Sequence, residues 1–243
     1  MARIDEVAAG IFRISAFNPV YQITFNQFLI ADERPALIHT GIHSAYDAVR
    51  KAVAEVIDPA RLAYIIVPHF EADECGGMGR FVQEAPRAVL LCSEVGSGVN
   101  LSGWDYGGPV KGMREGDVVQ LGEHTLQFIE TPHVHHWDSM MVFEQRTRSL
   151  FPADLFIQPG EQPPVVNQNL GKEMCGLYRQ VGIFASEKPV LQAVDRIERL
   201  KAEWVHPMHG GSLPKEIATE FISALRGEPF AYEGKLLGRM LPT

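Results

Sequence analysis

Four short polar clusters contain most of the residues in this sequence that could bind a metal ion. The densest is the segment HFEADE at residues 69–74, which directly follows an almost unbroken apolar run. If the segment stays extended, His69, Glu71 and Asp73 point the same way and can converge on one point. One imidazole and three carboxylates so close together need a counter-charge, which a bound metal ion supplies. Taken alone, the segment could equally be a solvated acidic loop.

The other three clusters favour the metal-binding interpretation. The segment TPHVHHWDSM (131–140) holds three histidines, HPMHGG (206–211) holds two, and LFPADLF (150–156) holds one aspartate. Each cluster lies next to a predicted strand end, and strand ends at one edge of an α/β sheet are a common place for a site. We therefore expect the four clusters to meet around one metal site.

Strands and helices are mixed along the chain without a break in composition. We expect strands at 11–16, 24–31, 35–40, 62–68, 88–92, 117–121, 125–130, 139–144, 148–151 and 203–205. We expect helices at 43–57, 177–183, 190–200 and 216–225, with a further one at the end of the stretch 69–85. This mixture indicates one α/β domain over residues 1–243.

Composition excludes several classes of protein. The net charge of −8 and the 46% of hydrophobic residues are typical of a soluble globular chain and argue against nucleic-acid binding. No stretch approaches the roughly 20 apolar residues that span a membrane, and no signal peptide is apparent. Three scattered cysteines without a CxxC pair exclude a disulfide framework and argue against a thiolate zinc site. We expect a cytoplasmic protein.

The order of the four clusters resembles that of the metallo-β-lactamase superfamily. Its usual first motif is HxHxDH, followed by a later histidine, a bridging aspartate and a last histidine. Here Glu71 replaces the second histidine, and this is similar to the HxExDH motif of flavodiiron proteins. The segment TPHVHHWDSM resembles their T-P-x-x-H-W-P-D-S-M, and LFPADLFIQ resembles their LFSxDxFxQ. The stretch ITFNQFLIADERPALIHTG is similar to their T-x-N-x-Y-L and L-I-D-T strands, so the likeness runs from about Thr24 to Gly210.

The resemblance implies a fold and a set of ligands. The fold is an αββα sandwich, in which two mixed β-sheets are covered by helices. The first metal is held by His69, Glu71 and His135, the second by Asp73 and His209, and Asp154 bridges the two. A set with this many carboxylate oxygens suits iron or manganese, although zinc is an alternative.

Four residues near the expected ligands have open roles. Glu74 stands where the family usually has the second histidine of its HxExDH motif; it either ligates the second metal, reaches it through water or stays out. His39 replaces the aspartate of L-I-D-T and is either a supporting residue or a buried, hydrogen-bonded histidine. His133 and His136 are expected to line the pocket or to support ligands, and they remain possible ligands.

The resemblance implies a non-haem diiron protein that binds O2 at a dinuclear site, with NO as the alternative ligand. Flavodiiron proteins continue into a flavodoxin-like domain with FMN, whereas this chain ends at Thr243, so we expect no FMN in this chain. With a separate flavoprotein or rubredoxin as electron donor it would be an oxidoreductase; without one it would be an oxygen binder or sensor. The family also suggests a homodimer.

The alternative function is a dinuclear zinc hydrolase of the lactonase or thioesterase type. Two zinc ions lower the pKa of bridging water and make hydroxide available near neutral pH. Glu71 argues against it, because a hydrolase of this fold usually carries histidine at that position. A metal site without catalytic use is the third interpretation.

Overall fold

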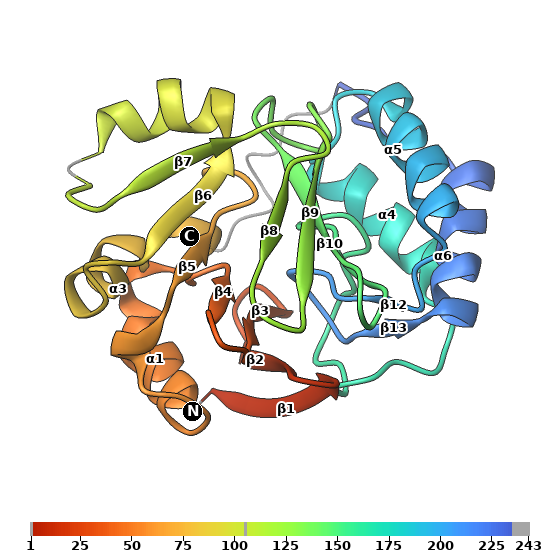
Figure 1. The fold of residues 1–243 in the computed structure, drawn as a ribbon. Helices are drawn as coiled ribbons and strands as arrows, with labels where there is room; N and C mark the ends of the chain where they lie inside the picture. Colours follow the sequence, from red (N-terminus) through yellow and green to blue (C-terminus); the bar gives the residue numbers. More distant parts are fainter. Residues whose placement is uncertain (1, 105, 235–243) are drawn as a thin grey trace.

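The computed structural model describes residues 2–104 and 106–234, which form two β-sheets packed face to face between two layers of helices (Figure 1). The first sheet has the order β1-β2-β3-β4-β5-β6-β7, and the second β13-β12-β11-β10-β9-β8. The first comprises β1 (Arg3–Ala8), β2 (Ile11–Asn18), β3 (Ile23–Ile30), β4 (Ala36–Ile38), β5 (Tyr64–Ile66), β6 (Val89–Ser93) and β7 (Val110–Met113). The second comprises β8 (Val118–Gln120), β9 (Thr125–Glu130), β10 (Met140–Glu144), β11 (Ser149–Phe151), β12 (Trp204–Val205) and β13 (Leu213–Pro214).

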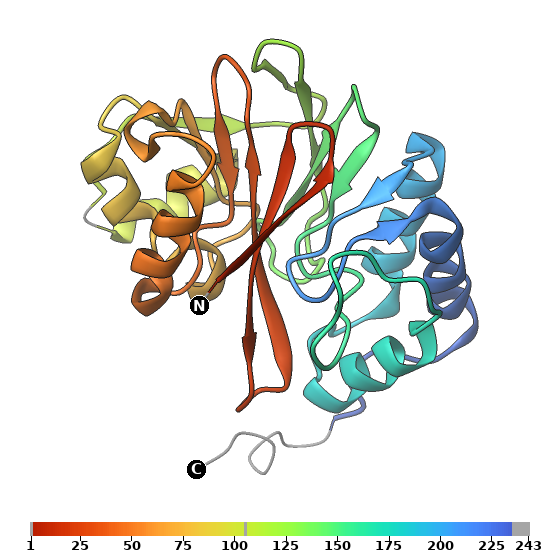
Figure 2. The same cartoon turned by 90° about the horizontal axis from the view of Figure 1, so that it is seen from below.

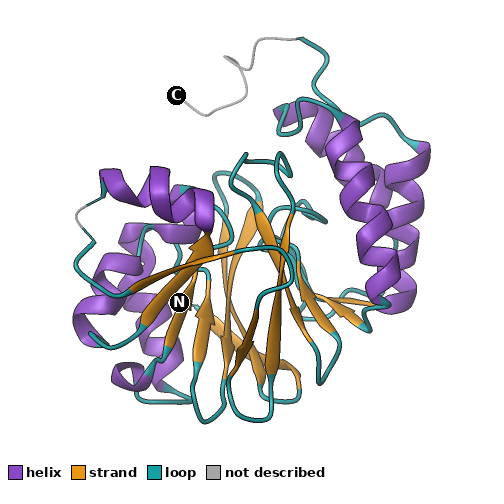
Figure 3. Ribbon diagram, turned by 45° about the horizontal axis from the view of Figure 1, so that its top comes forward, coloured by secondary structure: helices purple, strands orange, loops and turns teal. Residues whose placement is uncertain are grey.

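The helices lie on the two outer faces of this pair of sheets, as Figures 2 and 3 show. The first sheet is covered by α1 (Tyr46–Ala54) and α3 (Met78–Glu84), with the single turn α2 (Ala72–Cys75) before α3. The second sheet is covered by α4 (Gly171–Val181), α5 (Glu187–Leu200) and α6 (Lys215–Gly227). The αββα sandwich implied by the family resemblance is therefore confirmed.

Three apolar clusters hold the layers together. The middle cluster lies between the sheets, where Phe28 and Ile66 of the first meet Phe128 and Phe151 of the second. The outer clusters lie between each sheet and its helices. Because strands such as β4 and β5 are covered on both faces, all or nearly all of their residues are buried, which explains their continuous apolar sequences.

Strand direction brings the polar clusters to one edge. In the first sheet β4 and β5 run parallel. In the second, β11 and β12 run parallel, and β9 runs the same way as β11 because both are antiparallel to β10. The segments after β4, β5, β9, β11 and β12 consequently start from the carboxyl ends of strands, and these segments contain the expected ligands.

Most expected elements agree with the structure, with differences that have physical causes. The expected helix at 177–183 begins earlier, at Gly171, where a Cβ would lie 2.6 Å from Cβ of Ala224 in α6, so close helix packing requires glycine. The short or edge strands β1, β7 and β13 were not expected. Within the described residues no helix is long and apolar enough to cross a membrane.

Candidate metal centre

All six residues expected to bind metal come together at this edge of the sandwich. His69, Glu71 and Asp73 follow β5, with Glu71 at the start of α2 and Asp73 in its turn. The other three, His135, Asp154 and His209, follow strands of the second sheet. The centre is thus built at the junction of the two sheets from four loops that are far apart in the sequence.

The first group of ligand atoms comes from His69, Glu71, His135 and Asp154. Nε2 of His69 lies 3.2 Å from Oε2 of Glu71 and 3.3 Å from Oδ2 of Asp154. Nε2 of His135 lies 3.0 Å from the same Glu71 oxygen and 2.9 Å from the same Asp154 oxygen. One ligand atom of each residue lies within 4.8 Å of all the others. Two imidazole nitrogens and two carboxylate oxygens therefore surround one common position.

A second, smaller group lies on the other side of Asp154. Nε2 of His209 lies 3.4 Å from Oδ2 of Asp73 and 3.2 Å from Oδ1 of Asp154. Nδ1 of His209 is 3.1 Å from the carbonyl oxygen of Thr24, so the ring is oriented with Nε2 towards the carboxylates. The two carboxylate oxygens of Asp154 thus face different histidines, which is the arrangement of a bridging ligand.

Backbone strain surrounds the centre. Ala153 and Phe156, on either side of Asp154, have φ of +52° and +73°, and His133 and His39 have φ of +68° and +61°. A residue with a β-carbon adopts this left-handed conformation at a cost in free energy, and such residues cluster at functional sites. The fold thus keeps the loops around the expected ligands in unfavourable backbone conformations.

Electrostatic shifts describe a centre that holds positive charge. Burial opposes ionisation of Asp154, but its interactions with the imidazoles of His135, His209 and His69 outweigh this and keep its pKa well below the usual range. Burial works against the charged forms of His135 and His209 too, yet the neighbouring carboxylates raise their pKa values to about 9 and about 10. Hydrogen bonds from His135 and His69 lower the pKa of Glu71 to about 2.

The donor set fits metal ions in place of those protons. Oδ1 of Asp154 is buried and has no hydrogen-bond partner among the described residues, although it lies 3.2 Å from His209. A buried carboxylate oxygen without a partner is unfavourable unless a cation or proton compensates it. Imidazole and carboxylate ligands in this ratio suit iron, manganese or zinc.

Glu74 and His39 lie behind the ligands. The Glu74 carboxylate is fully buried, 3.2 Å from Nδ1 of His69 and 3.4 Å from Nδ1 of His39. It also accepts a hydrogen bond of 3.1 Å from the backbone N–H of His69. Of the alternatives left open by the sequence, the geometry favours Glu74 staying out of the second metal position, because it lies behind His69. His39 is buried next to Glu74, and neither of its ring nitrogens has a hydrogen-bond partner among the described residues.

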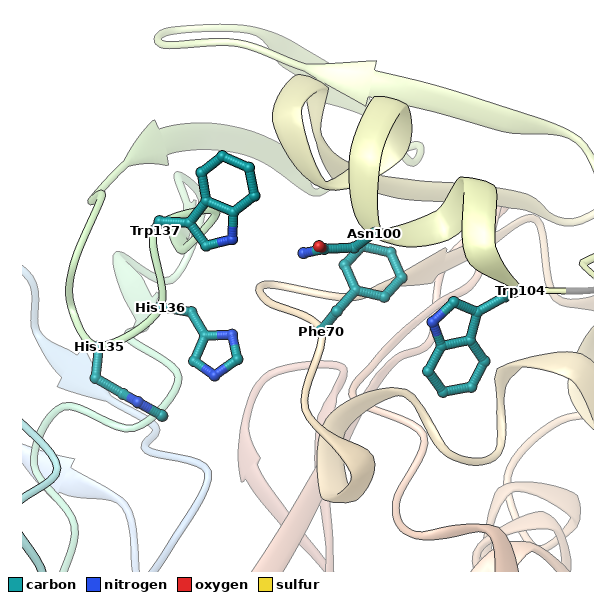
Figure 4. Close-up of a pocket in the computed structure, with 6 residues that line it drawn as sticks. All are labelled: Phe70, Asn100, Trp104, His135, His136 and Trp137. Atoms are coloured by element: carbon teal, nitrogen blue, oxygen red, sulfur yellow. The ribbon is translucent and has the colours of Figure 1, made fainter.

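His136 and His133 have different surroundings. The ring of His136 is 4.9 Å from that of His69 and lies in the wall of a cavity of about 420 Å³. The cavity is lined by Phe70, Asn100, Trp104, His135, His136 and Trp137 (Figure 4). His133 is exposed, and its backbone N–H donates to the carbonyl of His136. The cavity leads from solvent to His135, so it is an entrance to the centre.

Two supporting residues were not recognised from the sequence. Asp138 is buried and accepts hydrogen bonds from the backbone N–H of Phe70 and the side-chain amide of Asn100, at 3.3 and 2.8 Å. Tyr178, which is buried in the core, donates a hydrogen bond from its hydroxyl to the backbone carbonyl of Asp154. The D-S-M part of the 131–140 motif was the only signal for Asp138, and nothing local indicated the role of Tyr178.

Fold and site together define a metallo-β-lactamase-type sandwich with a histidine–carboxylate centre. The chain matches the family described as "ODP family beta lactamase" over residues 23–210, and it belongs to that family. It is 28% identical over 214 residues to an uncharacterised protein of Methanocaldococcus jannaschii. This match covers 85% of this chain and 53% of that protein. It is 29% identical over 150 residues to a nitric oxide reductase of Moorella thermoacetica. This match covers 60% of this chain and 37% of that protein.

Solved structures agree on the fold. The rubredoxin oxygen:oxidoreductase of Desulfovibrio gigas superposes with a TM-score of 0.84 at 22% identity, over 92% of this chain and 60% of that one. Flavodiiron cores are thus structural neighbours, as the resemblance implied. The chain spans only about a third to a half of the curated relatives it matches.

Proposed function

We propose that the protein binds two iron ions at this centre and uses them to bind O2, and also NO. The observation that carries the proposal is the Glu71 carboxylate, whose Oε2 lies 3.2 Å from Nε2 of His69 and 3.0 Å from Nε2 of His135. A carboxylate here replaces the histidine usual in hydrolases of this fold. The names of two similar proteins, a nitric oxide reductase and a rubredoxin oxygen:oxidoreductase, support the same chemistry.

In this proposal the iron ions supply electrons and open coordination positions for the diatomic ligand. The protein contributes orientation and shielding. Thr24 and Glu74 contact the Nδ1 atoms of His209 and His69, so that each Nε2 faces the centre. His136 stands at the entrance, where its ring can donate a hydrogen bond to an incoming diatomic ligand.

The source of electrons divides the proposal into two forms. With a separate flavoprotein or rubredoxin as donor, the protein is an oxygen or nitric oxide reductase. Without a donor, it binds O2 once per reduced centre and acts as an oxygen binder or sensor. Both forms require the same metal centre.

One experiment tests the proposal. The protein is produced anaerobically with iron, its metal content is measured, and O2 is added to the reduced form while the visible spectrum and O2 uptake are followed. We expect two irons per chain, a spectral change, and uptake of O2. O2 uptake that continues while reduced rubredoxin or a reduced flavoprotein is supplied identifies a reductase. Uptake that stops after one O2 per reduced centre identifies an oxygen binder.

The size of the cavity favours the alternative function, a zinc hydrolase. A volume of about 420 Å³ is far more than a diatomic ligand occupies and leaves room for a larger substrate. The same preparation distinguishes it. Two zinc ions per chain, no spectral change with O2, and turnover of a lactone or thioester would replace our proposal with zinc hydrolysis.

A further inference from the structure

The carboxylate of Glu74 faces the backbone N–H of His69 and the imidazoles of His69 and His39. Oε2 accepts the hydrogen bond from the backbone N–H of His69 and lies 3.2 Å from Nδ1 of the same residue. Oε1 lies 3.4 Å from Nδ1 of His39. All three side chains are completely buried. Within the described residues Glu74 forms no ion pair with His209, whose carboxylate partners are Asp73 and Asp154.

This arrangement orients His69. Its Nδ1 faces Glu74, while its Nε2 faces Glu71 and Asp154. A carboxylate behind a metal-binding histidine fixes the tautomer, so that the nitrogen facing the metal carries the lone pair. Glu74 thus supports a ligand of the first position.

The two metal positions consequently have unequal numbers of protein ligands. The first has four: His69, Glu71, His135 and Asp154. The second has three, which are Asp73, His209 and the shared Asp154. Within the described part of the chain, only the first set forms a group of donor atoms that all lie within 4.8 Å of one another.

We attribute the inequality to the identities of two contacting residues, His39 and Glu74. This chain has His39 and Glu74, whereas the flavodiiron motifs that it resembles, L-I-D-T and HxExDH, have aspartate and histidine at those places. An imidazole and a carboxylate have therefore changed places within one buried pair. The exchange keeps an acid and a base in contact, but it removes the imidazole that position 74 would offer to a second metal.

We propose that the protein binds its two metal ions unequally, one tightly at the four-ligand position and one weakly and exchangeably at the three-ligand position, with Glu74 as a positioning residue for His69. This inference rests on the proposed dinuclear function. It makes occupancy of the second position a function of the surrounding metal concentration, so the centre would be dinuclear only when the metal is plentiful.

Equilibrium dialysis of the metal-free full chain against Fe²⁺ under anaerobic conditions, repeated with Co²⁺, tests the proposal. We expect a two-step isotherm, with one ion per chain retained through a desalting column and the second one lost. Two ions that are retained together, or that bind in a single step, would overturn the inequality even without any variant.

Glu74→Gln separates the positioning role from ligation. As a positioning residue, Glu74 supports the first ion, so the variant should weaken the tight step about 10- to 100-fold and alter its Co²⁺ absorption band, while the weak step remains. If Glu74 were a ligand of the second ion, the variant would instead lose the weak step and keep the tight step and its band.

Two further variants bracket this result. His209→Ala is the matched control, because it should remove the weak step and leave one ion retained. The exchanged pair His39→Asp with Glu74→His should raise the retained metal to two ions per chain; one retained ion would show that the exchange is not the cause. Since these measurements use no O2, unequal binding without reaction with O2 would reject the proposed function alone, and equal binding with such a reaction would reject this inference alone.

Discussion

The hydroxyl of Tyr178 bonds two backbone groups of the loop that carries Asp154. It donates a hydrogen bond of 3.1 Å to the carbonyl of Asp154 and accepts one of 3.0 Å from the backbone N–H of Ile157. The side chain is completely buried in the core beneath α4. A core tyrosine therefore fixes the backbone of the residue that we propose to bridge the two metal positions.

Tyr178→Phe tests this relationship. Removal of the hydroxyl leaves a buried carbonyl and a buried N–H without their partner, which costs about 1–3 kcal/mol per group. We expect a lower free energy of unfolding, measured by urea denaturation of the metal-free protein, and weaker metal binding. Tyr46→Phe, which removes a hydroxyl bonded to Glu84 on the other side of the molecule, is the control. It should leave metal binding unchanged, and equal losses in both variants would contradict the role of Tyr178.

The ligand assignment is tested by His135→Ala and Asp154→Ala. The first removes one imidazole from the four-ligand position, and the second removes the shared carboxylate, so we expect both to lose metal strongly, measured as ions per folded chain. His124→Ala is the comparison, because His124 lies away from the centre against Glu144. Equal metal content in all three variants would reject the assignment.

His124 is buried although it lies in the connection between β8 and β9. It is only 1% exposed, and its Nδ1 lies 3.1 Å from Oε1 of the buried Glu144. Burial raises the pKa of Glu144, but His124, Thr147 and the backbone of Arg146 outweigh burial and lower that pKa to about 2.

The lowered pKa of Glu144 predicts how the free energy of unfolding depends on pH. Since the pKa of Glu144 is lower in the folded protein, its ionised form stabilises the fold above the ordinary value of 4.5, and this contribution disappears as the pH falls towards 2. The loss amounts to at most on the order of 3 kcal/mol. Unfolding free energies at a series of pH values should show this slope, and Glu144→Gln should flatten it. An unchanged slope in the variant would show that other groups dominate acid unfolding.

Gly77 and Gly79, which follow the segment 69–74, allow the effect of a glycine-to-alanine change on stability to be compared at neighbouring positions. A Cβ at Gly77 would lie 2.6 Å from the carbonyl oxygen of Thr40, whereas a Cβ at Gly79 meets nothing within 4 Å. Gly77→Ala must displace backbone, so we expect a loss of more than about 1 kcal/mol. Gly79→Ala in α3 should instead stabilise by about 0.5–1 kcal/mol. Thermal unfolding of both variants measures the difference, and the same sign for both would refute the packing argument.

Much of the fold was accessible from local pattern. Runs such as ITFNQFLI and LAYIIVP have the composition and length of strands with covered faces, and the structure has β3 and β5 within them. The same holds for the hairpin β8–β9, where a turn separates two alternating segments. The early start of α4 could not be seen, because its first turn owes its position to contact between Gly171 and α6.

The sequence by itself determined which side chains are available to bind metal and that they follow strand ends, because residue type and spacing are properties of the chain. Only the tertiary structure decided how each group is used. It turned Glu74 towards His69 and His39, buried His124 against Glu144, and placed Tyr178 beneath Asp154. Those pairings depend on how distant segments pack, and a buried charge or hydroxyl takes whichever partner the packing provides.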